Sequence, residues 1–203
     1  MTLGLIIAGG RSQRFGAEKA VATLGGISLL ERSRRLLMDS CREVAVNAPL
    51  GSAAAALAEA LGAPVVPDAE DGPRGPLSGV LAGLIWAYGQ GEELLLTAPC
   101  DAPLLPRDLG PRLLAALGPE AAAVARSPDG VQPLCAVWRT SMIEAIEWAL
   151  AEGEHPPVRQ VLASACAVEA AFDDAGAFLN INTAQDLIEA ARRMEAEPPA
   201  ARA

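Results

Sequence analysis

Apolar residues recur along the chain with two spacings, one typical of strands and one typical of helices. A short apolar run at 3–8 ends at two glycines and predicts a buried first strand. Leucines within 27–39, and a stripe at i, i+3, i+4 and i+7 within 81–88, each cover one helical face. By the same criteria we expect further strands at 43–47, 64–67, 93–98, 121–125, 134–139 and 167–172, and further helices at 52–61, 109–117, 141–152 and 183–194.

The alternation of strands with helices predicts the fold class: α/β, a single Rossmann-like three-layer α/β/α domain with a mostly parallel sheet. We expect this domain to span residues 1–194, and the Pro/Ala-rich stretch 195–203 to be a flexible tail. In such sheets ligands bind beyond the carboxyl ends of the strands. The residues directly after each strand are therefore the candidates for a functional site.

The amino-acid composition indicates which residues build the core and which kinds of catalytic or metal site are not expected. Hydrophobic residues make up 51% of the chain and aromatic residues only 3%, so Leu, Val, Ile and Ala must build the core. Trp86, Trp138 and Trp148 are expected to pack in the core or on helix faces. The four cysteines are scattered without a C-x-x-C pair, and His155, in a predicted loop, is the only histidine. A zinc site or a Ser-His-Asp triad is therefore not expected.

Charge is unevenly distributed. The formal net charge of −9 disfavours non-specific binding to nucleic acid or to an anionic membrane. No apolar run approaches the roughly 20 residues of a membrane span, so we expect a soluble, cytoplasmic and reduced protein. The first 17 residues nevertheless contain no acidic residue, carry Arg11 and Arg14, and are followed by Lys19. A local cluster of positive charge on an acidic protein suits a small anionic ligand.

The loop after the first strand carries that positive charge. It runs from Ala8 through Gly9 and Gly10 to Lys19. Glycines after a strand let backbone N–H groups approach phosphate oxygens closely. The spacing matches neither G-x-G-x-x-G nor G-x-x-x-x-G-K-[ST]. We favour phosphate binding over the alternative, a turn with solvated basic residues.

Polar residues also follow the later strands. Asp101 stands between Pro99 and Pro103 after the strand at 93–98. It is either a rigid ligand for Mg²⁺ or an Asp that caps a turn. Asn47 and Asp68 follow the second and third predicted strands and could face the same crevice, although each alone could be a cap or turn residue.

Two further segments have two interpretations each. Gly75, Pro76 and Leu77 precede Ser78, which could cap the next helix, or the loop could close over a base or an acceptor. Asn180 and Asn182 would lie on the same side of an extended segment, or Asn182 or Thr183 could cap the last helix.

Taken in order, these motifs resemble those of the molybdenum cofactor guanylyltransferases. The resemblance runs from Leu3 to about Ala190. It implies an enzyme that transfers GMP from GTP to molybdopterin or molybdenum-molybdopterin, releases pyrophosphate and requires Mg²⁺. Gln13 departs from the family pattern, where many relatives have a second arginine, and Glu18 replaces an Asp. The opening loop is also one residue shorter than in some members.

The resemblance also implies roles for individual residues. Lys19 would be the phosphate-binding lysine, Asp101 the metal ligand, and these two the catalytic pair. Nucleotide contacts would fall on these two and on Ile7, Ala8, Gly9, Gly10, Arg11, Arg14, Asn47 and Asp68. Acceptor contacts would fall on Gly75, Pro76, Leu77, Asn180 and Asn182.

Other functions stay open at the level of sequence. One alternative is a molybdopterin cytidylyltransferase or a sugar-phosphate nucleotidyltransferase. Another is a nucleotide-binding accessory protein without turnover, although Lys19 and Asp101 together argue against it. The glycine spacing disfavours an NAD-dependent oxidoreductase. Other cofactor-biosynthesis proteins or molybdoenzyme chaperones are expected as further partners.

Overall fold

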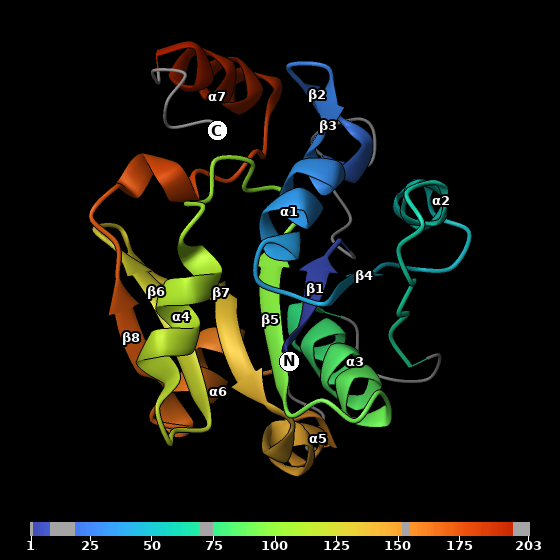
Figure 1. Ribbon diagram of the computed structural model, residues 1–203, viewed down its shortest axis with the longest axis vertical. Coiled ribbons are helices and arrows are strands. Elements are labelled where there is room, and N and C mark those ends of the chain that lie inside the picture. Colours follow the sequence, from blue (N-terminus) through green and yellow to red (C-terminus); the bar gives the residue numbers. More distant parts are fainter. Residues whose placement is uncertain (1, 9–18, 70–74, 152–154, 197–203) are drawn as a thin grey trace.

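A six-stranded sheet forms the centre of the protein (Figure 1). The computed structural model describes residues 2–8, 19–69, 75–151 and 155–196. The strands lie in the order β4-β1-β5-β7-β6-β8, and β7 alone among them runs antiparallel to its two neighbours. Their bounds are β1 Thr2–Ile7, β4 Glu43–Asn47, β5 Leu94–Pro99, β6 Ala122–Ser127, β7 Gly130–Arg139 and β8 Val168–Ala171.

Helices cover both faces of this sheet, which confirms the predicted three-layer α/β/α class. One face packs against α1 (Leu29–Met38), α2 (Ala53–Ala60) and α4 (Leu109–Leu117). The other packs against α3 (Pro76–Gly89), α5 (Ile143–Ala151) and α6 (Val158–Ser164). Successive side chains of a strand point to opposite faces, so β1 contributes Leu5 to one core and Ile6 to the other.

Local sequence explains where several helices begin and how closely they approach the sheet. Ser28 and Ser52 accept hydrogen bonds from the third backbone N–H beyond them and so cap α1 and α2. In α3, a Cβ atom at Gly83 would lie 2.9 Å from a methyl carbon of Leu95. The absence of a side chain at Gly83 therefore lets α3 lie directly on β5.

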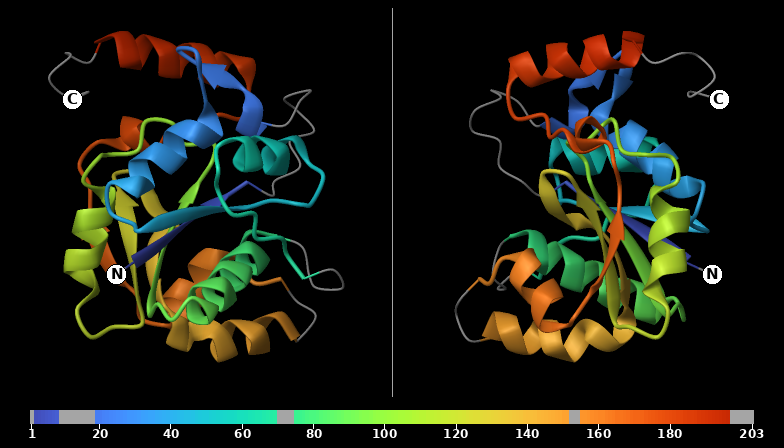
Figure 2. Two further views of the ribbon diagram at one scale, coloured as in Figure 1. Left: turned by 45° about the vertical axis from the view of Figure 1, so that its right-hand side comes forward. Right: turned by 90° about the vertical axis from the view of Figure 1, so that its left-hand side faces the viewer.

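A smaller cluster lies at the edge of the sheet where β1 and β5 end. It combines α7 (Ala184–Ala196) with a hairpin of β2 (Thr23–Leu24) and β3 (Ile27–Ser28), which lie together in both views of Figure 2. Leu24, Leu29, Ile181 and Ala190 form its buried centre. Three short 3₁₀ helices complete the described elements: η1 Lys19–Val21, η2 Thr140–Met142 and η3 Ala175–Phe178.

Several sequence predictions need correction. Residues 64–67 do not form a strand: Val65 makes only an isolated bridge to Val46, because the flanking prolines cannot donate to a ladder. Ser78 lies in the first turn of α3 and is not its cap, since Gly75 occupies that position. The strand predicted at 134–139 begins at Gly130, and α6 and the β2–β3 hairpin were not predicted.

Other predictions are confirmed in part. Trp138 is fully buried, whereas Trp148 on α5 is 68% exposed and does not pack in the core. The last helix continues to Ala196, two residues further than expected, and 197–203 lie outside the described residues. The proposed domain boundary at 194 therefore stays a prediction. None of the helices described is both long enough and apolar enough to cross a membrane.

Candidate active site

Three parallel strands end side by side and define the site. Ile7, the last residue of β1, pairs with Asn47 at the end of β4 and with Pro99 at the end of β5. The carboxyl ends of parallel strands meet at one edge, which is where open α/β sheets bind ligands. The polar residues expected there, Asn47 and Asp101, do lie at this edge.

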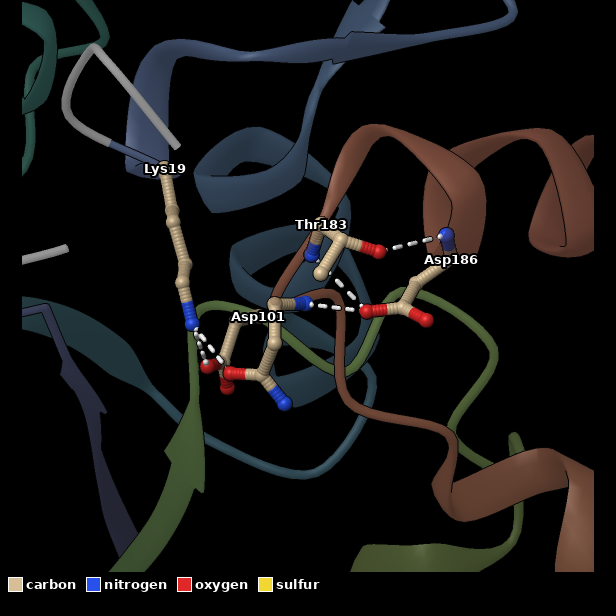
Figure 3. Close-up of polar contacts among 5 residues, drawn as sticks. Lys19, Asp101, Thr183 and Asp186 are labelled. Carbon is tan, nitrogen blue, oxygen red and sulfur yellow. Dashed lines mark hydrogen bonds and ion pairs between the residues drawn. The ribbon is translucent and has the colours of Figure 1, made fainter. Parts of the chain in front are cut away.

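Lys19 and Asp101 form the centre of the site. The Lys19 ammonium nitrogen lies 3.2 Å from an Asp101 carboxylate oxygen, and the two side chains point toward one another (Figure 3). The same nitrogen donates a hydrogen bond of 2.5 Å to the side-chain carbonyl oxygen of Asn182. Both side chains of the ion pair keep some solvent exposure, 16% for Lys19 and 24% for Asp101. A small anion or cation can therefore reach the pair.

The segment before α7 reaches this centre from the far end of the chain. The backbone N–H of Ile181 donates to the Asp101 carbonyl oxygen at 2.7 Å, and the Ile181 side chain is fully buried. This anchor holds the neighbouring Asn182 beside Lys19. The tertiary structure thus brings together Lys19, Asp101 and Asn182, which the sequence assigned to separate motifs.

Asn47 is a buried residue whose side-chain nitrogen donates two hydrogen bonds. Its side chain is 3% exposed, and its nitrogen donates to the Val66 carbonyl oxygen at 3.0 Å and to the Asp68 carboxylate at 2.8 Å. A Cβ atom at Gly79 of α3 would lie 2.8 Å from the Asn47 side-chain carbon. Asn47 therefore orients Asp68, which is only half-buried, and rests against the first turns of α3.

The residues predicted to bind the acceptor fall into two separate places. Gly75, Pro76 and Leu77 begin α3, on the side of Asn47, and Leu77 is buried in the core. Asn180 and Asn182 instead line a cavity next to Lys19. Gly75, Pro76 and Leu77 are not part of the lining of that cavity, so their predicted role toward the acceptor stays a prediction.

The cavity beside Asn182 has a volume of about 480 Å³. Its walls come from the β6–β7 hairpin, from η3 and the segment after it, and from α7. Its polar lining residues are Asp129, Gln132, Asn180, Asn182, Asp186 and Arg193, and the others are Ala175, Gly176, Phe178 and Leu179.

Part of the predicted phosphate loop is not described. Gly9, Gly10, Arg11 and Arg14 lie outside the described residues, so their roles stay predictions. At the start of the loop, the Ala8 N–H donates to the Asn47 carbonyl oxygen at 2.9 Å. The Ile7 carbonyl oxygen accepts from the Cys100 N–H at 3.1 Å. These two backbone groups therefore belong to the sheet's hydrogen-bond ladder.

Sequence reasoning missed the polar residues of α7. The carboxylate of Asp186 accepts 2.8 Å hydrogen bonds from the backbone N–H groups of Asn182 and Thr183. These bonds, led by that from Asn182, hold the pKa of Asp186 below its usual range, and Lys19 lowers it further. The Thr-x-x-Asp spacing at 183–186 was the available signal, because it is a capping pattern. No local signal marked Arg193.

Buried thiols lie behind the site. Burial raises the pKa of the Cys135 thiol, and the negative charge of Asp101 raises it further. Cys100, directly before Asp101, is also buried. The raised pKa keeps the Cys135 thiol protonated at neutral pH, so Cys135 adds no negative charge to the site.

Several known proteins have sequences similar to this chain. Residues 4–170 match the family model for the MobA-like NTP transferase domain. A molybdenum cofactor guanylyltransferase of Cereibacter sphaeroides is 43% identical over 188 residues, which cover 92% of this chain and 94% of that protein. One from Rhizobium johnstonii is 36% identical over 202 residues, covering 95% and 93% of the two chains.

Solved structures show the same fold. The molybdopterin-guanine dinucleotide biosynthesis protein A of Archaeoglobus fulgidus superposes with a TM-score of 0.76 at 20% identity, over 97% of this chain and all of that one. A 2-C-methyl-D-erythritol 4-phosphate cytidylyltransferase of Thermus thermophilus gives 0.71 at 24% identity, over 97% and 100%. With the sequence relatives, the match places this chain in one family: it belongs to the molybdenum cofactor guanylyltransferases.

Proposed function

We propose that the protein transfers GMP from GTP to molybdopterin or molybdenum-molybdopterin, with Mg²⁺, and forms molybdopterin guanine dinucleotide and pyrophosphate. One observation carries the proposal: Lys19 and Asp101 meet at the carboxyl ends of β1 and β5 in a member of this family. A cation and a carboxylate at this edge are what a triphosphate and its metal ion require.

The reaction needs no general base from the protein. The acceptor's terminal phosphate has a second pKa of about 6 and is largely ionised at neutral pH. One of its oxygens attacks the α-phosphorus of GTP, a new P–O–P linkage forms, and the bond to the β-phosphate oxygen breaks to release pyrophosphate. This agrees with the chain's one histidine, His155, which precedes α6 and is not among the residues at the site.

The barrier then arises mainly from bringing two anions together. Lys19 would bind the triphosphate and follow the charge that develops on the leaving pyrophosphate. Arg11, Arg14 and the amides of Gly9 and Gly10 would add to it as predicted from the sequence. Positioning and electrostatics account for most of the rate in phosphoryl-type transfers of this kind.

The residues present suit Mg²⁺. Asp101 offers a partly exposed carboxylate, a hard oxygen ligand of the kind Mg²⁺ prefers. Among the described residues no group of three or more His, Cys, Asp or Glu could enclose a metal ion. One carboxylate shared with substrate phosphates is the usual protein contribution to a magnesium site. When bound, the ion would neutralise phosphate charge and stabilise the leaving group.

The nucleotide and the acceptor would use different groups around Lys19. Asn47 and Asp68, joined by a hydrogen bond of 2.8 Å, would contact the nucleotide. The polar cavity of about 480 Å³ beside Asn182 would take the acceptor, and its volume falls in the usual range for small-ligand sites. Its amide side chains, including Asn180, suit the donor and acceptor edges of a pterin.

An assay with each triphosphate tests the proposal. Purified protein, Mg²⁺ and molybdopterin would be supplied with GTP, CTP, ATP or UTP, and pyrophosphate release and the dinucleotide product would be measured. GTP is expected to react in preference by roughly 30-fold or more, because a wrong base would leave two buried polar groups unpaired, each at a cost of about 1–3 kcal/mol.

The other outcomes identify the alternatives. Preference for CTP would move the protein to the cytidylyltransferases, whose fold it shares. Reaction with a sugar phosphate in place of molybdopterin would support a sugar-phosphate nucleotidyltransferase. Binding of a nucleotide without turnover would support the accessory-protein alternative. A cytoplasmic location and contacts with other cofactor-biosynthesis proteins or chaperones are part of the proposal.

A further inference from the structure

The start of α7 is stabilised by a reciprocal pair of hydrogen bonds. The Thr183 hydroxyl oxygen accepts from the Asp186 N–H at 3.2 Å, and the Asp186 carboxylate accepts from the Thr183 N–H at 2.8 Å. This is a capping box with Asp in the place usually taken by Glu or Gln. Figure 3 shows the Asp186 carboxylate turned toward Thr183.

The same carboxylate makes one bond more than a capping box requires. It also accepts from the backbone N–H of Asn182 at 2.8 Å, one residue before the cap. The Asn182 backbone is thus held from both sides. On one side the buried Ile181 donates to the Asp101 carbonyl oxygen, and on the other Asp186 accepts from Asn182 itself.

The Asn182 side chain connects this restrained backbone to Lys19. Its side-chain oxygen accepts the 2.5 Å hydrogen bond from the Lys19 ammonium group, which also lies 3.2 Å from Asp101. Asn182 is itself exposed, so no packing against the core fixes its position. The two backbone anchors on either side are therefore what determines where its side chain meets Lys19.

We propose that Asp186 is a positioning residue for Lys19: by holding the Asn182 backbone, it keeps the Asn182 side chain in place to orient the ammonium group beside Asp101. The inference rests on the proposed function in so far as Lys19 binds the triphosphate there. Asp186 lines the cavity beside Asn182 and bonds to the backbone of Asn182 and Thr183. Its effect on Lys19 passes mainly through Asn182, beside a smaller direct attraction between the two charges.

Thr183 offers a matched control. Thr183→Ala removes the hydroxyl that accepts from Asp186 and so weakens the same cap, but it leaves both backbone N–H groups that bond to the Asp186 carboxylate. Asp186→Ala removes the two hydrogen bonds to that carboxylate and keeps the backbone N–H that donates to the Thr183 hydroxyl. Asp186→Glu restores a carboxylate of the kind most common at this position of a capping box.

A spectroscopic readout follows from the sequence. Lys19 is the only lysine in the chain, so protein labelled with ¹⁵N-lysine gives a single side-chain ammonium signal by NMR. We expect a shifted, slowly exchanging signal in the wild type, in Asp186→Glu and in Thr183→Ala. In Asp186→Ala the signal should move toward the position of a solvated lysine and exchange faster with water.

Turnover provides the second readout. Asp186→Ala should lower kcat for GMP transfer about tenfold with a smaller change in KM for GTP, because a misplaced lysine still attracts phosphate but no longer follows the developing charge. Asp186→Glu should recover most of the rate. Thr183→Ala should stay within about twofold of the wild type, with all variants measured below their unfolding temperatures.

The outcomes separate this inference from the proposed function. An ammonium signal unchanged in Asp186→Ala would overturn the positioning role, whatever the turnover. The same shift in Thr183→Ala as in Asp186→Ala would also overturn it, since helix capping alone would then explain both. A wild-type protein that transfers no GMP would overturn the proposed function, while the NMR comparison would still decide whether Asp186 orients Lys19.

Discussion

Lys19 and Asp101 lie 82 positions apart in the chain, yet the Lys19 ammonium nitrogen is 3.2 Å from the Asp101 carboxylate. The approach is possible because β1 and β5 are parallel neighbours, so the segments that follow them leave the sheet at the same edge. The pair combines a cation for phosphate oxygens with a carboxylate for a metal ion.

Replacing Lys19 with Ala should reduce kcat/KM for GMP transfer by about 10²–10³-fold, the usual cost of losing one preorganised electrostatic contact in a transition state. The unfolding free energy should change by only about 1 kcal/mol, because the ion pair is partly exposed. Steady-state kinetics and thermal unfolding check both. Arg35→Ala on α1, which loses only an exposed pair with Glu31, is the control. Near-normal turnover of the Lys19→Ala variant at subsaturating GTP would show that Lys19 does not bind the triphosphate.

Asp101→Asn keeps the size of the side chain and removes the charge that Mg²⁺ prefers. Metal-dependent turnover should fall at least about a hundredfold, since metal stabilisation of transition-state charge is worth several kcal/mol. GTP affinity measured calorimetrically without metal should change far less. The control is Asp108→Asn, an exposed carboxylate that pairs with Arg112 on α4. If the variant and the wild type gave the same Mg²⁺ titration, Asp101 would be a turn residue and not a metal ligand.

Gly79→Ala should disturb Asn47 and, through it, Asp68. The added Cβ atom would lie 2.8 Å from the Asn47 side-chain carbon, so this side chain must move from its buried position. We expect a loss of about 1–3 kcal/mol in the free energy of unfolding, typical of overpacking, together with weaker GTP binding.

Gly89→Ala provides the control for this helix. A Cβ atom at Gly89, at the end of the same α3, would meet nothing within 4 Å. Alanine there should leave stability unchanged or raise it by up to about 1 kcal/mol, because Ala is a better helix former than Gly. Equal denaturation midpoints for Gly79→Ala and Gly89→Ala would contradict the prediction, because they would show that the Asn47 side chain can move without loss of stability.

Thiol labelling should distinguish the cysteines by burial. Cys166 is exposed, whereas burial raises the pKa of Cys41 to about 12 and raises that of Cys135 as well. A raised pKa favours the protonated thiol, so only about 10⁻⁴ of Cys41 would be thiolate at pH 8. Mass spectrometry after iodoacetamide treatment at pH 8 should therefore find Cys166 modified first. Labelling of Cys41 should accelerate as the pH rises or as denaturant unfolds the chain, and equal initial rates would contradict the buried environment.

Sequence periodicity predicted most of the fold because it reports local physics. The apolar run of β1 and the leucine stripe of α1 each reveal which face is buried, and burial of one face determines the element. The segments missed are those where local signals are weak. The β2–β3 hairpin has only two residues in each strand, and Pro64 and Pro67 leave Val65 with a single bridge instead of a strand.

The sequence by itself determined the α/β class, the strand ends and the residue types at the site, because these depend on neighbours within a few positions. Only the tertiary structure decided which of those residues meet. Lys19 contacts Asn182 across 163 positions, Asn47 holds Asp68 instead of standing free, and Asn180 and Asn182 line a cavity that residues 75–77 do not line. Contacts of this kind depend on the pairing order of strands and on how closely helices pack, and neither is encoded in any short window of the chain.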